Sequence, residues 1–453
     1  MNDELRQIPS VDKLLSALPT GFAVPHALKL AAARKVLEDL RLTVRAGEAV
    51  PNLKTLAQLT KASVESQLQP SLRRVINASG VILQTNLGRA PLSEAALNAM
   101  RAVGGGYSNL EFDLEAGERG GRHDHAGRLI RETTGAEDGI VVNNNAAALF
   151  FVLSAFTAGR DVIVSRGQAV EIGGGFRIPD VLRQSGARLV EVGTTNRTYA
   201  RDYAEAATGD CAAILRVHTS NFQVVGFTAE PALSELADVA HRHEALLIDD
   251  LGSGCLIDTA TYGLRREPTV RESIEAGADL VLFSGDKLLG GPQCGIIAGR
   301  KDLVATLKRH PLARALRVDK TTVAALEATL LAYFKGTERT DIPIWRMLAQ
   351  DLPMLRRRAT RWQKAAGSGA TVVVSRTMVG GGSLPGDGVP TWCAALQSSD
   401  RNEAALANSL RLHETPIVAR VEVGRVLLDP RTVDPGDDRL VAAALAGYVP
   451  HGG

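Results

Sequence analysis

The stretch GADLVLFSGDKLLGGPQCG, residues 277–295, joins an apolar run to a polar turn that carries one lysine, Lys287. The run up to residue 285 is bounded by glycines and has the composition of a buried strand. Lys287 therefore follows a strand end, at the edge of an open α/β sheet where ligands bind. Three roles are open for it: an imine-forming lysine, a phosphate-binding lysine, or a solvated loop lysine.

Short apolar runs recur on both sides of this stretch, between residues 75 and 315, and helical segments separate them. This alternation predicts an α/β fold with a mainly parallel sheet, of seven-stranded type, between layers of helices. The predicted strands are GIVVN, DVIVS, RLVEVG, AAILRVH, ALLIDD, DLVLFSG and CGIIAG.

Two smaller domains flank this section in our interpretation. Residues 1–70 contain three segments with apolar residues at helical spacing, which predicts a small helical N-terminal domain. It is locally basic, because residues 1–74 hold eleven lysines and arginines against seven aspartates and glutamates. The large domain is predicted over 71–318 and a small α+β domain over 319–453, with strands ATVVVS, PTWCAAL, PIVARVEV and RVLLDP.

The composition of the chain is that of an ordinary soluble protein. It has 453 residues, a formal net charge of +2 and 45% hydrophobic residues, so no charge excess by itself demands nucleic acid. No apolar run approaches membrane-spanning length and the start lacks a signal-peptide core, so we expect a cytoplasmic protein that does not enter a membrane. The four cysteines lack CxxC spacing, and neither a disulfide framework nor a metal site is indicated.

A candidate phosphate site lies in GIVVNNNAAALFFVLSAF, residues 139–156. The pattern predicts a strand, a tight polar turn and a helix that begins near Asn145 or Ala146. Asparagine is a good N-cap, and small residues such as Ala146 and Ala147 let an anion approach the free N–H groups of the first turn. An ordinary capped helix is the alternative.

Two carboxylates, Asp249 and Asp250, end the predicted strand in EALLIDDLGSG, residues 244–254. Such groups at the end of an apolar strand need a cation, a metal or a protonated ring nitrogen as partner. Magnesium would be expected with a nucleotide, but the chain has no GxxxxGK[ST] loop to bind one. A protonated pyridine nitrogen fits better.

The order of these features is the one expected for pyridoxal 5′-phosphate. A helix N-terminus comes first, then a strand-end aspartate, and about forty residues later Lys287 with Ser284 three positions before it. The aldehyde of this cofactor forms an imine with lysine, its ring nitrogen pairs with aspartate, and its phosphate needs N–H and hydroxyl donors.

Three arginines are candidates for binding an oxyanion, because the guanidinium fork suits such groups. Arg89 lies in the loop TNLGRAPLS among small residues. Arg314 and Arg317, in HPLARALRVDK, are three residues apart, so a helix would place them on one face. Solvated helix faces are the alternative for these last two.

Several motifs along the chain resemble the bacterial selenocysteine synthases, the L-seryl-tRNA(Sec) selenium transferases. The resemblance covers essentially the full length, including the N-terminal helical segment. The motifs are IPSVDKLL, RVINASGVILQTNLGRAPLS, YSNLEFDLEAGERGGRHDH, VNNNAAA, SRGQAVEIGGGFRIPDV, HTSNFQVVGF, DDLGSG, SGDKLLGGPQCG and GGGSLPG.

This resemblance implies a fold-type-I pyridoxal phosphate enzyme that assembles as a homodecamer of five dimers. It implies conversion of seryl-tRNA(Sec) to selenocysteinyl-tRNA(Sec) with selenophosphate, through a cofactor-bound aminoacrylyl intermediate. The basic N-terminal domain would then contact the tRNA.

The resemblance also assigns roles to residues. Lys287 corresponds to the imine lysine, Asp249 to the partner of the ring nitrogen and Asp286 to an active-site carboxylate. The family positions associated with the selenium donor's oxyanion are Arg89, Arg314 and Arg317.

Two further positions are left open. Gln168 stands where an acidic residue is expected in many relatives, which puts a proton-transfer role there in doubt. Arg420 is either a structural remnant of a carboxylate clamp or a contact to the tRNA end.

Two rival functions remain from the sequence. A pyridoxal phosphate lyase acting on a small amino acid or amino sugar phosphate would use the same Lys287, Asp249 and helix N-terminus. Such a lyase would not need the basic segment 1–70. A non-catalytic RNA-binding protein, with Lys287 merely structural, is the second rival.

Overall fold

The computed structural model describes residues 5–173, 175–397 and 402–446, and the chain divides into two compact units between Arg74 and Val75. The first unit is a helical bundle whose small core is formed by leucine, valine and alanine side chains. Ser10 and Asn52 cap the first and third helices through their side chains. The three predicted helices are present as α2 (Val11–Ser16), α3 (His26–Arg45) and α4 (Leu53–Leu68).

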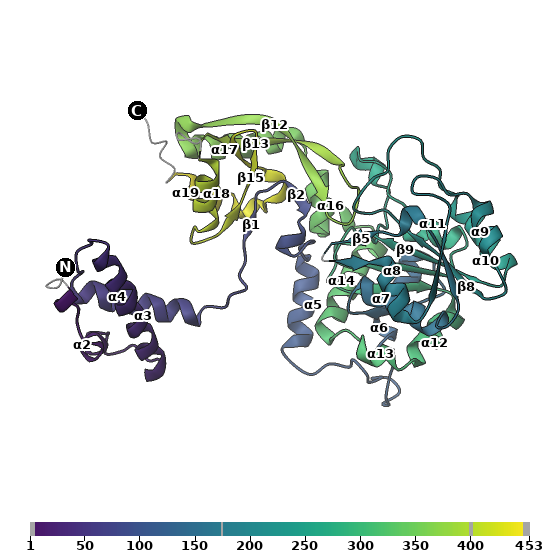
Figure 1. The fold of residues 1–453 in the computed structure, drawn as a ribbon, viewed down its shortest axis with the longest axis horizontal. Helices are drawn as coiled ribbons and strands as arrows, with labels where there is room; N and C mark the ends of the chain where they lie inside the picture. Colours follow the sequence, from purple (N-terminus) through teal and green to yellow (C-terminus); the bar gives the residue numbers. More distant parts are fainter. Residues whose placement is uncertain (1–4, 174, 398–401, 447–453) are drawn as a thin grey trace. The chain divides into compact units, whose positions relative to one another are not determined.

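A large sheet forms the centre of the second unit (Figure 1). Within the described residues it has seven strands, and every one of the predicted apolar runs supplies one of them. All neighbours are parallel except β11, which runs antiparallel to both β10 and β3. The spatial order is β3 (Asp138–Val142), β11 (Gly295–Gly299), β10 (Leu280–Ser284), β9 (Leu246–Gly252), β8 (Cys211–Val217), β4 (Asp161–Ser165) and β7 (Arg188–Val192).

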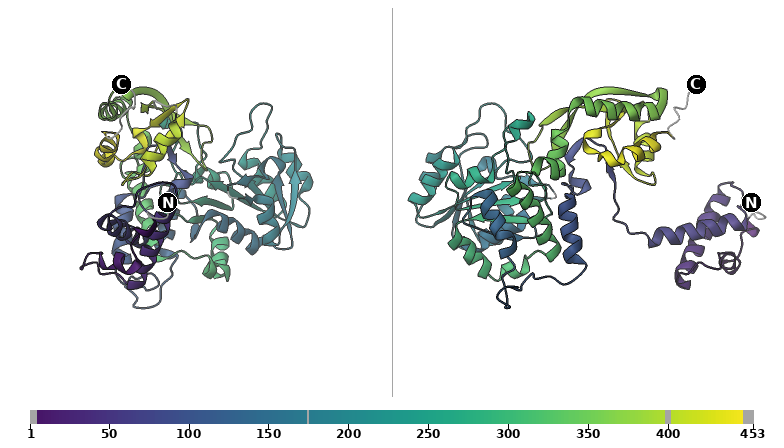
Figure 2. Two further views of the ribbon diagram at one scale, coloured as in Figure 1. Left: turned by 60° about the vertical axis from the view of Figure 1, so that its left-hand side comes forward. Right: turned by 180° about the vertical axis from the view of Figure 1, so that it is seen from behind.

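Helices cover both faces of this sheet because its strands are apolar on both sides (Figure 2). One core cluster joins the sheet to α6 (Asp124–Thr134), α9 (Ala200–Ala206), α10 (Leu233–Arg242), α11 (Val270–Glu275) and α14 (Lys320–Lys335). The other joins it to α7 (Asn145–Phe156), α8 (Ile178–Ser185), α12 (Lys301–Arg309) and α13 (Leu312–Ala315).

The C-terminal part of this unit is built on a second sheet. Its order is β15 (Arg420–Glu422), β16 (Arg425–Leu428), β13 (Gly388–Leu396), β12 (Ala370–Gly380) and β2 (Val81–Leu83). A third core cluster packs this sheet against α17 (Leu352–Ala366), α18 (Glu403–Arg411) and α19 (Asp438–Ala446).

Residues 75–83 join the C-terminal layer although the sequence placed them in the large domain. β2 pairs in parallel with β12, and β1 (Ile76–Asn77) pairs in parallel with β14 (Ile417–Val418). The predicted boundary at 318/319 lies at the N-cap of α14, within the single compact unit. The remaining elements are α5 (Glu94–Gly104), β5 (Glu171–Ile172), β6 (Phe176–Arg177), α15 (Glu338–Asp341) and α16 (Pro343–Ala349).

In the described part of the chain, no helix is both long enough and apolar enough to cross a bilayer. The four cysteines are buried as free thiols.

Candidate active site

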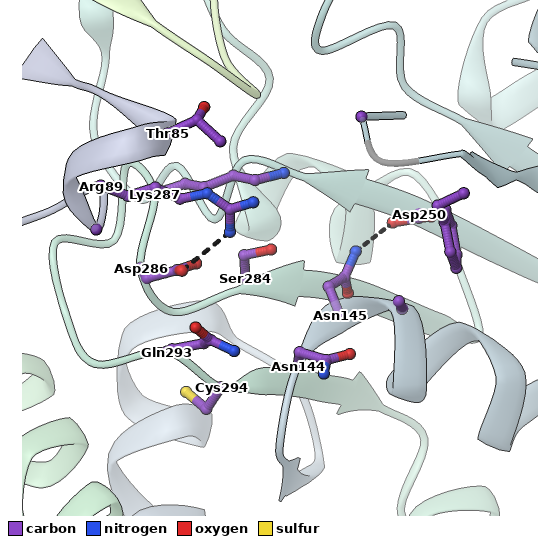
Figure 3. Close-up of a pocket in the computed structure, with 14 residues that line it drawn as sticks. Thr85, Arg89, Asn144, Asn145, Asp250, Ser284, Asp286, Lys287, Gln293 and Cys294 are labelled. Atoms are coloured by element: carbon purple, nitrogen blue, oxygen red, sulfur yellow. Dashed lines mark hydrogen bonds and ion pairs between the residues drawn. The ribbon is translucent and has the colours of Figure 1, made fainter. Parts of the chain in front are cut away.

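A cavity of about 400 Å³ lies where β9 and β10 end and α7 begins (Figure 3). This is the edge of the sheet at which α/β folds bind their ligands. It is polar, and its side chains come from five separate parts of the chain. The lining consists of Thr85, Gly88, Arg89, Asn144, Asn145, Ala146, Gly173, Phe176, Asp250, Ser284, Asp286, Lys287, Gln293 and Cys294.

Lys287 is a buried amine, with only 6% of its surface exposed. It extends into the cavity between Arg89 and Asp250 (Figure 3). Burial, and then the positive charge of Arg89, lower the pKa of Lys287 below the usual value for lysine. The structure therefore excludes the solvated loop lysine considered from the sequence.

A glycine holds the Lys287 side chain in place. Gly382 has a φ of +83°, and a Cβ atom built there would lie 2.6 Å from Cε and 2.8 Å from Nζ of Lys287. A side chain at this position would displace the end of Lys287, so the backbone of the loop 380–388 packs directly against the lysine.

The two strand-end aspartates point in opposite directions, as successive residues of a strand must. Asp250 lines the cavity, where its Oδ1 accepts a hydrogen bond of 2.8 Å from Asn145 Nδ2. Asp249 lies on the other side of β9, fully buried, with Arg216 Nη1 at 2.9 Å from Oδ1 and 3.2 Å from Oδ2. Of these two aspartates, Asp250 and not the predicted Asp249 lines the cavity.

The environment of Asp250 affects its ionisation. Complete burial raises its pKa to about 6, against the opposing effects of the Asn145 hydrogen bond and the Lys287 charge. A cationic hydrogen-bond donor placed in the cavity would favour the ionised form of this carboxylate.

The start of α7, where the sequence predicts a phosphate site, lies at the cavity. Asn144 is the N-cap, and its Oδ1 accepts the Ala147 N–H at 2.8 Å. Ala147 does not line the cavity, whereas Asn145 and Ala146 do. Asn145 Oδ1 is buried without a hydrogen-bond partner among the described residues.

Arg89 and Asp286 form an ion pair at the cavity wall, with 2.9 Å between Nη1 and Oδ2. Arg89 adopts a left-handed backbone conformation, φ 63°, directly after the left-handed Gly88. The loop is fixed to the lysine turn, because the Ala90 N–H donates to the Asp286 carbonyl at 3.2 Å. Ser284 lines the same wall at the end of β10, as predicted.

Arg314 and Arg317 do not line this cavity. α13 ends at Ala315, so the two arginines do not share one helix face as expected. The backbone of Arg317 instead forms an isolated antiparallel β-bridge with Val142. Its side-chain Nη1 lies 4.0 Å from Glu111 Oε1. Both side chains are exposed.

The two positions left open by the sequence have structural partners. Gln168 is buried in a separate small cavity, where Nε2 donates to Glu230 at 2.7 Å and Oε1 accepts the Val217 N–H at 3.0 Å. Arg420 donates from Nη1 to the Ser79 carbonyl at 2.8 Å and from Nε to Glu422 at 3.0 Å. Neither side chain lines the Lys287 cavity.

Sequence reasoning missed Gly382, Thr85, Phe176, Gln293 and Cys294 as neighbours of the lysine. The first belongs to the glycine-rich stretch GGGSLPG, about ninety residues after Lys287, and nothing local indicates its target. The others lie in a short 3-10 helix, a strand and loops, and only the tertiary fold brings them together.

Comparison with known proteins identifies the family of this chain. A profile of the L-seryl-tRNA selenium transferase family matches residues 75–434. The chain belongs to this family. The L-seryl-tRNA(Sec) selenium transferase of Moorella thermoacetica is 48% identical over 464 residues, covering 99% of this chain and 98% of its own. The Aquifex aeolicus transferase is 43% identical over 450 residues, covering 98% and 99%.

The fold has a solved counterpart in a D-glucosaminate-6-phosphate ammonia-lyase. That structure aligns with a TM-score of 0.60 and 23% identity, over 85% of this chain and 97% of the lyase. At this identity the likeness concerns the fold alone. The predicted fold class, an α/β fold-type-I pyridoxal phosphate enzyme, is confirmed, and so is the predicted family.

Proposed function

We propose that this chain is a pyridoxal-phosphate-dependent L-seryl-tRNA(Sec) selenium transferase, which converts seryl-tRNA(Sec) to selenocysteinyl-tRNA(Sec) with selenophosphate as donor. The observation that carries the proposal is Lys287, a buried amine of lowered pKa in the polar cavity of a chain of this family. The full-length match to the curated transferases favours this activity over that of a small-molecule lyase.

The residues of the cavity fit pyridoxal 5′-phosphate. Asp250 suits a protonated ring nitrogen, since such a partner would hold this buried carboxylate in its charged form. Asn145 and Ala146 at the start of α7, with the Ser284 hydroxyl, offer donors for a phosphate. When bound, the cofactor supplies the electron sink that stabilises a carbanion at the substrate carbon.

Lys287 is the residue placed to move the proton. As a neutral amine, its Nζ takes the proton from Cα of the seryl group, and burial favours the neutral form. Gly382 keeps the amine directed into the cavity, and the Asn145 hydrogen bond orients Asp250. The proton that Lys287 has taken leaves with the serine hydroxyl as water, and the selenium of the donor bonds to Cβ while Cα regains a proton. Hydrolysis of the selenium–phosphorus bond then releases phosphate.

The selenium donor requires an anion-binding group beside this reaction. Arg89 fits that role, because it lines the cavity and its guanidinium is fixed by Asp286 at 2.9 Å. We assign Arg314 and Arg317 to the same donor in the cavity of a neighbouring subunit, within a homodecamer. Their exposure on the chain described above supports this assignment.

The N-terminal helical unit, predicted over 1–70, is assigned to tRNA contact in a cytoplasmic enzyme. Its basic composition supports this role through phosphate neutralisation. The shape of the structured RNA would supply selectivity.

The decisive experiment incubates the holoprotein with selenophosphate and either seryl-tRNA(Sec) or seryl-tRNA(Ser). We expect selenocysteine on the first tRNA only, and no product with Lys287→Ala. Borohydride reduction followed by peptide mass spectrometry should locate the cofactor on Lys287. A holoprotein with the cofactor on Lys287 that converts neither tRNA would refute the transferase assignment.

A further inference from the structure

The exposed face of α17 forms a basic groove in the C-terminal part of the second unit. Four cations occupy it at helical spacing: Arg356, Arg357, Arg361 and Lys364. Trp392, on the neighbouring strand β13, forms one wall, and the groove has a volume of about 830 Å³. We call this surface, lined also by Leu352, Pro353 and Thr360, the α17 groove.

The charges of this groove are largely uncompensated. Arg357 and Lys364 are exposed and form no ion pair with an acidic side chain among the described residues. Arg356 lies over the Trp392 ring at 4.9 Å, and Arg361 reaches Asp438 at 3.4 Å while remaining 63% exposed. Asp438 is already bound by the buried Arg358 at 2.7 Å, so it neutralises little of the groove.

We propose that the α17 groove binds the sugar–phosphate backbone of the seryl-tRNA substrate near its aminoacylated end. The inference rests on the transferase function proposed above and names the surface that holds its substrate. A row of arginines and lysines is the feature that neutralises consecutive phosphates. A half-exposed tryptophan beside them offers a ring on which an unpaired base can stack.

The strand β12 connects this groove to the reacting lysine. Trp392 pairs with Val374 on β12, and the same strand runs on to the glycines that pack against Lys287. From Val374 to Gly382 the chain advances eight residues, or about 25 Å in an extended strand. A tRNA held at the groove could therefore place its single-stranded 3′ end in the cavity.

Charge reversal in the groove tests the proposal. We expect the Arg357→Glu/Lys364→Glu holoprotein to bind seryl-tRNA roughly tenfold or more weakly than wild type. The slope of log affinity against log salt should fall by about 2, one per lost phosphate contact. The matched control is Arg411→Glu/Arg439→Glu, which makes the same charge change at exposed positions on α18 and α19 and should bind normally.

Fluorescence gives an independent measurement. The chain has three tryptophans, all in described segments, and Trp345 and Trp362 are fully buried. Binding of tRNA should therefore protect the fluorescence of Trp392 from acrylamide, and Trp392→Phe should remove this protection.

The outcomes separate this proposal from the one on function. Wild-type affinity and salt slope in the charge-reversed protein, with conversion intact, would overturn the groove assignment alone. An equal loss of tRNA affinity in the control variant would also overturn it. So would a change in the assembly size of the charge-reversed protein, measured by sedimentation, because the groove would then be a subunit contact. Failure of the wild-type protein to bind seryl-tRNA would overturn both.

Discussion

At the scale of single residues, we expect the neighbours Asp250 and Asp249 to have different roles, the first in the reaction and the second in the stability of the fold. We expect Asp250→Asn to lower the rate of selenium transfer on the order of 100-fold without loss of folding stability, because it removes the carboxylate charge that lines the cavity. Asp249→Asn should leave Arg216 without its charged partner and lower the free energy of unfolding by roughly 3 kcal/mol. Transfer kinetics and denaturant unfolding of the two variants give both quantities; equal kinetic losses would contradict the assignment.

The ionisation of Asp250 predicts a pH effect in the cofactor-free protein. Its folded-state pKa of about 6 lies above the ordinary 3.8, so between these values the folded state holds a proton that the unfolded chain has released. Stability should therefore fall as the pH rises through this window, by roughly 3 kcal/mol from this group. Denaturant unfolding at the two ends of the window, compared with Asp250→Asn, isolates the effect; identical pH profiles would contradict it.

The sequence predicted which types of residue form the site and their order along the chain. The structure was needed to show which way each side chain points. Lys287 and Ser284 could be predicted because each follows from where an apolar run ends. The choice between Asp249 and Asp250 could not, since both faces of a buried parallel strand are apolar and give no alternation to read. The predicted pairing of Arg314 and Arg317 on one helix face is wrong, because α13 ends at Ala315, two residues before Arg317.

At the scale of elements, Asn144 both caps α7 and lines the cavity, so we expect it to support the helix and the cofactor. We expect Asn144→Ala to cost about 1 kcal/mol of stability, because it frees the Ala147 N–H. It should also weaken binding of the cofactor, since Asn144 lines the cavity. Asn52→Ala removes the equivalent cap of α4 and should leave cofactor affinity, measured by absorbance titration, unchanged. Equal affinity in both variants would contradict the dual role.

The loop that carries Gly382 makes a second element-scale prediction. Gly382→Ala should reduce selenium transfer at least tenfold by displacing the lysine, which is about the effect of a small misplacement on a rate. The fold should survive, because the displaced atoms are the flexible end of a side chain. Gly336→Ala is the control: its φ is +70° and nothing lies within 4 Å, so it introduces similar backbone strain alone. Comparable activity in the two variants would contradict the positioning role.

Strands with a long apolar run could be predicted from the sequence, and strands of two or three residues could not. The seven strands of the large sheet are continuous apolar runs, and each was found. β1 and β2 have two and three residues, too few for a pattern, so their pairing with the C-terminal strands was missed. The break between α16 and α17 follows from the Asp351 cap and from Pro353 in the first turn.

At the scale of the whole molecule, the division at Arg74/Val75 predicts two separable activities. A protein that begins at Val75 should fold, bind pyridoxal phosphate on Lys287 and lose most of its affinity for tRNA. The first unit has its own apolar core, so the isolated segment can be tested for RNA binding directly. Absorbance and a tRNA filter-binding assay measure the two properties; full tRNA affinity in the shortened protein would contradict the role given to the first unit.

Gly295, where β11 returns from the lysine turn, has a consequence for how this scaffold can change. A Cβ built there would lie 2.2 Å from the Asn144 carbonyl oxygen and 2.9 Å from the Asn145 nitrogen. Main chain therefore touches main chain between the strand that follows the lysine and the turn that opens α7. This contact fixes the spacing between the lysine turn and the start of α7, so we expect new substrate preferences to arise from replaced wall residues and not from a wider site.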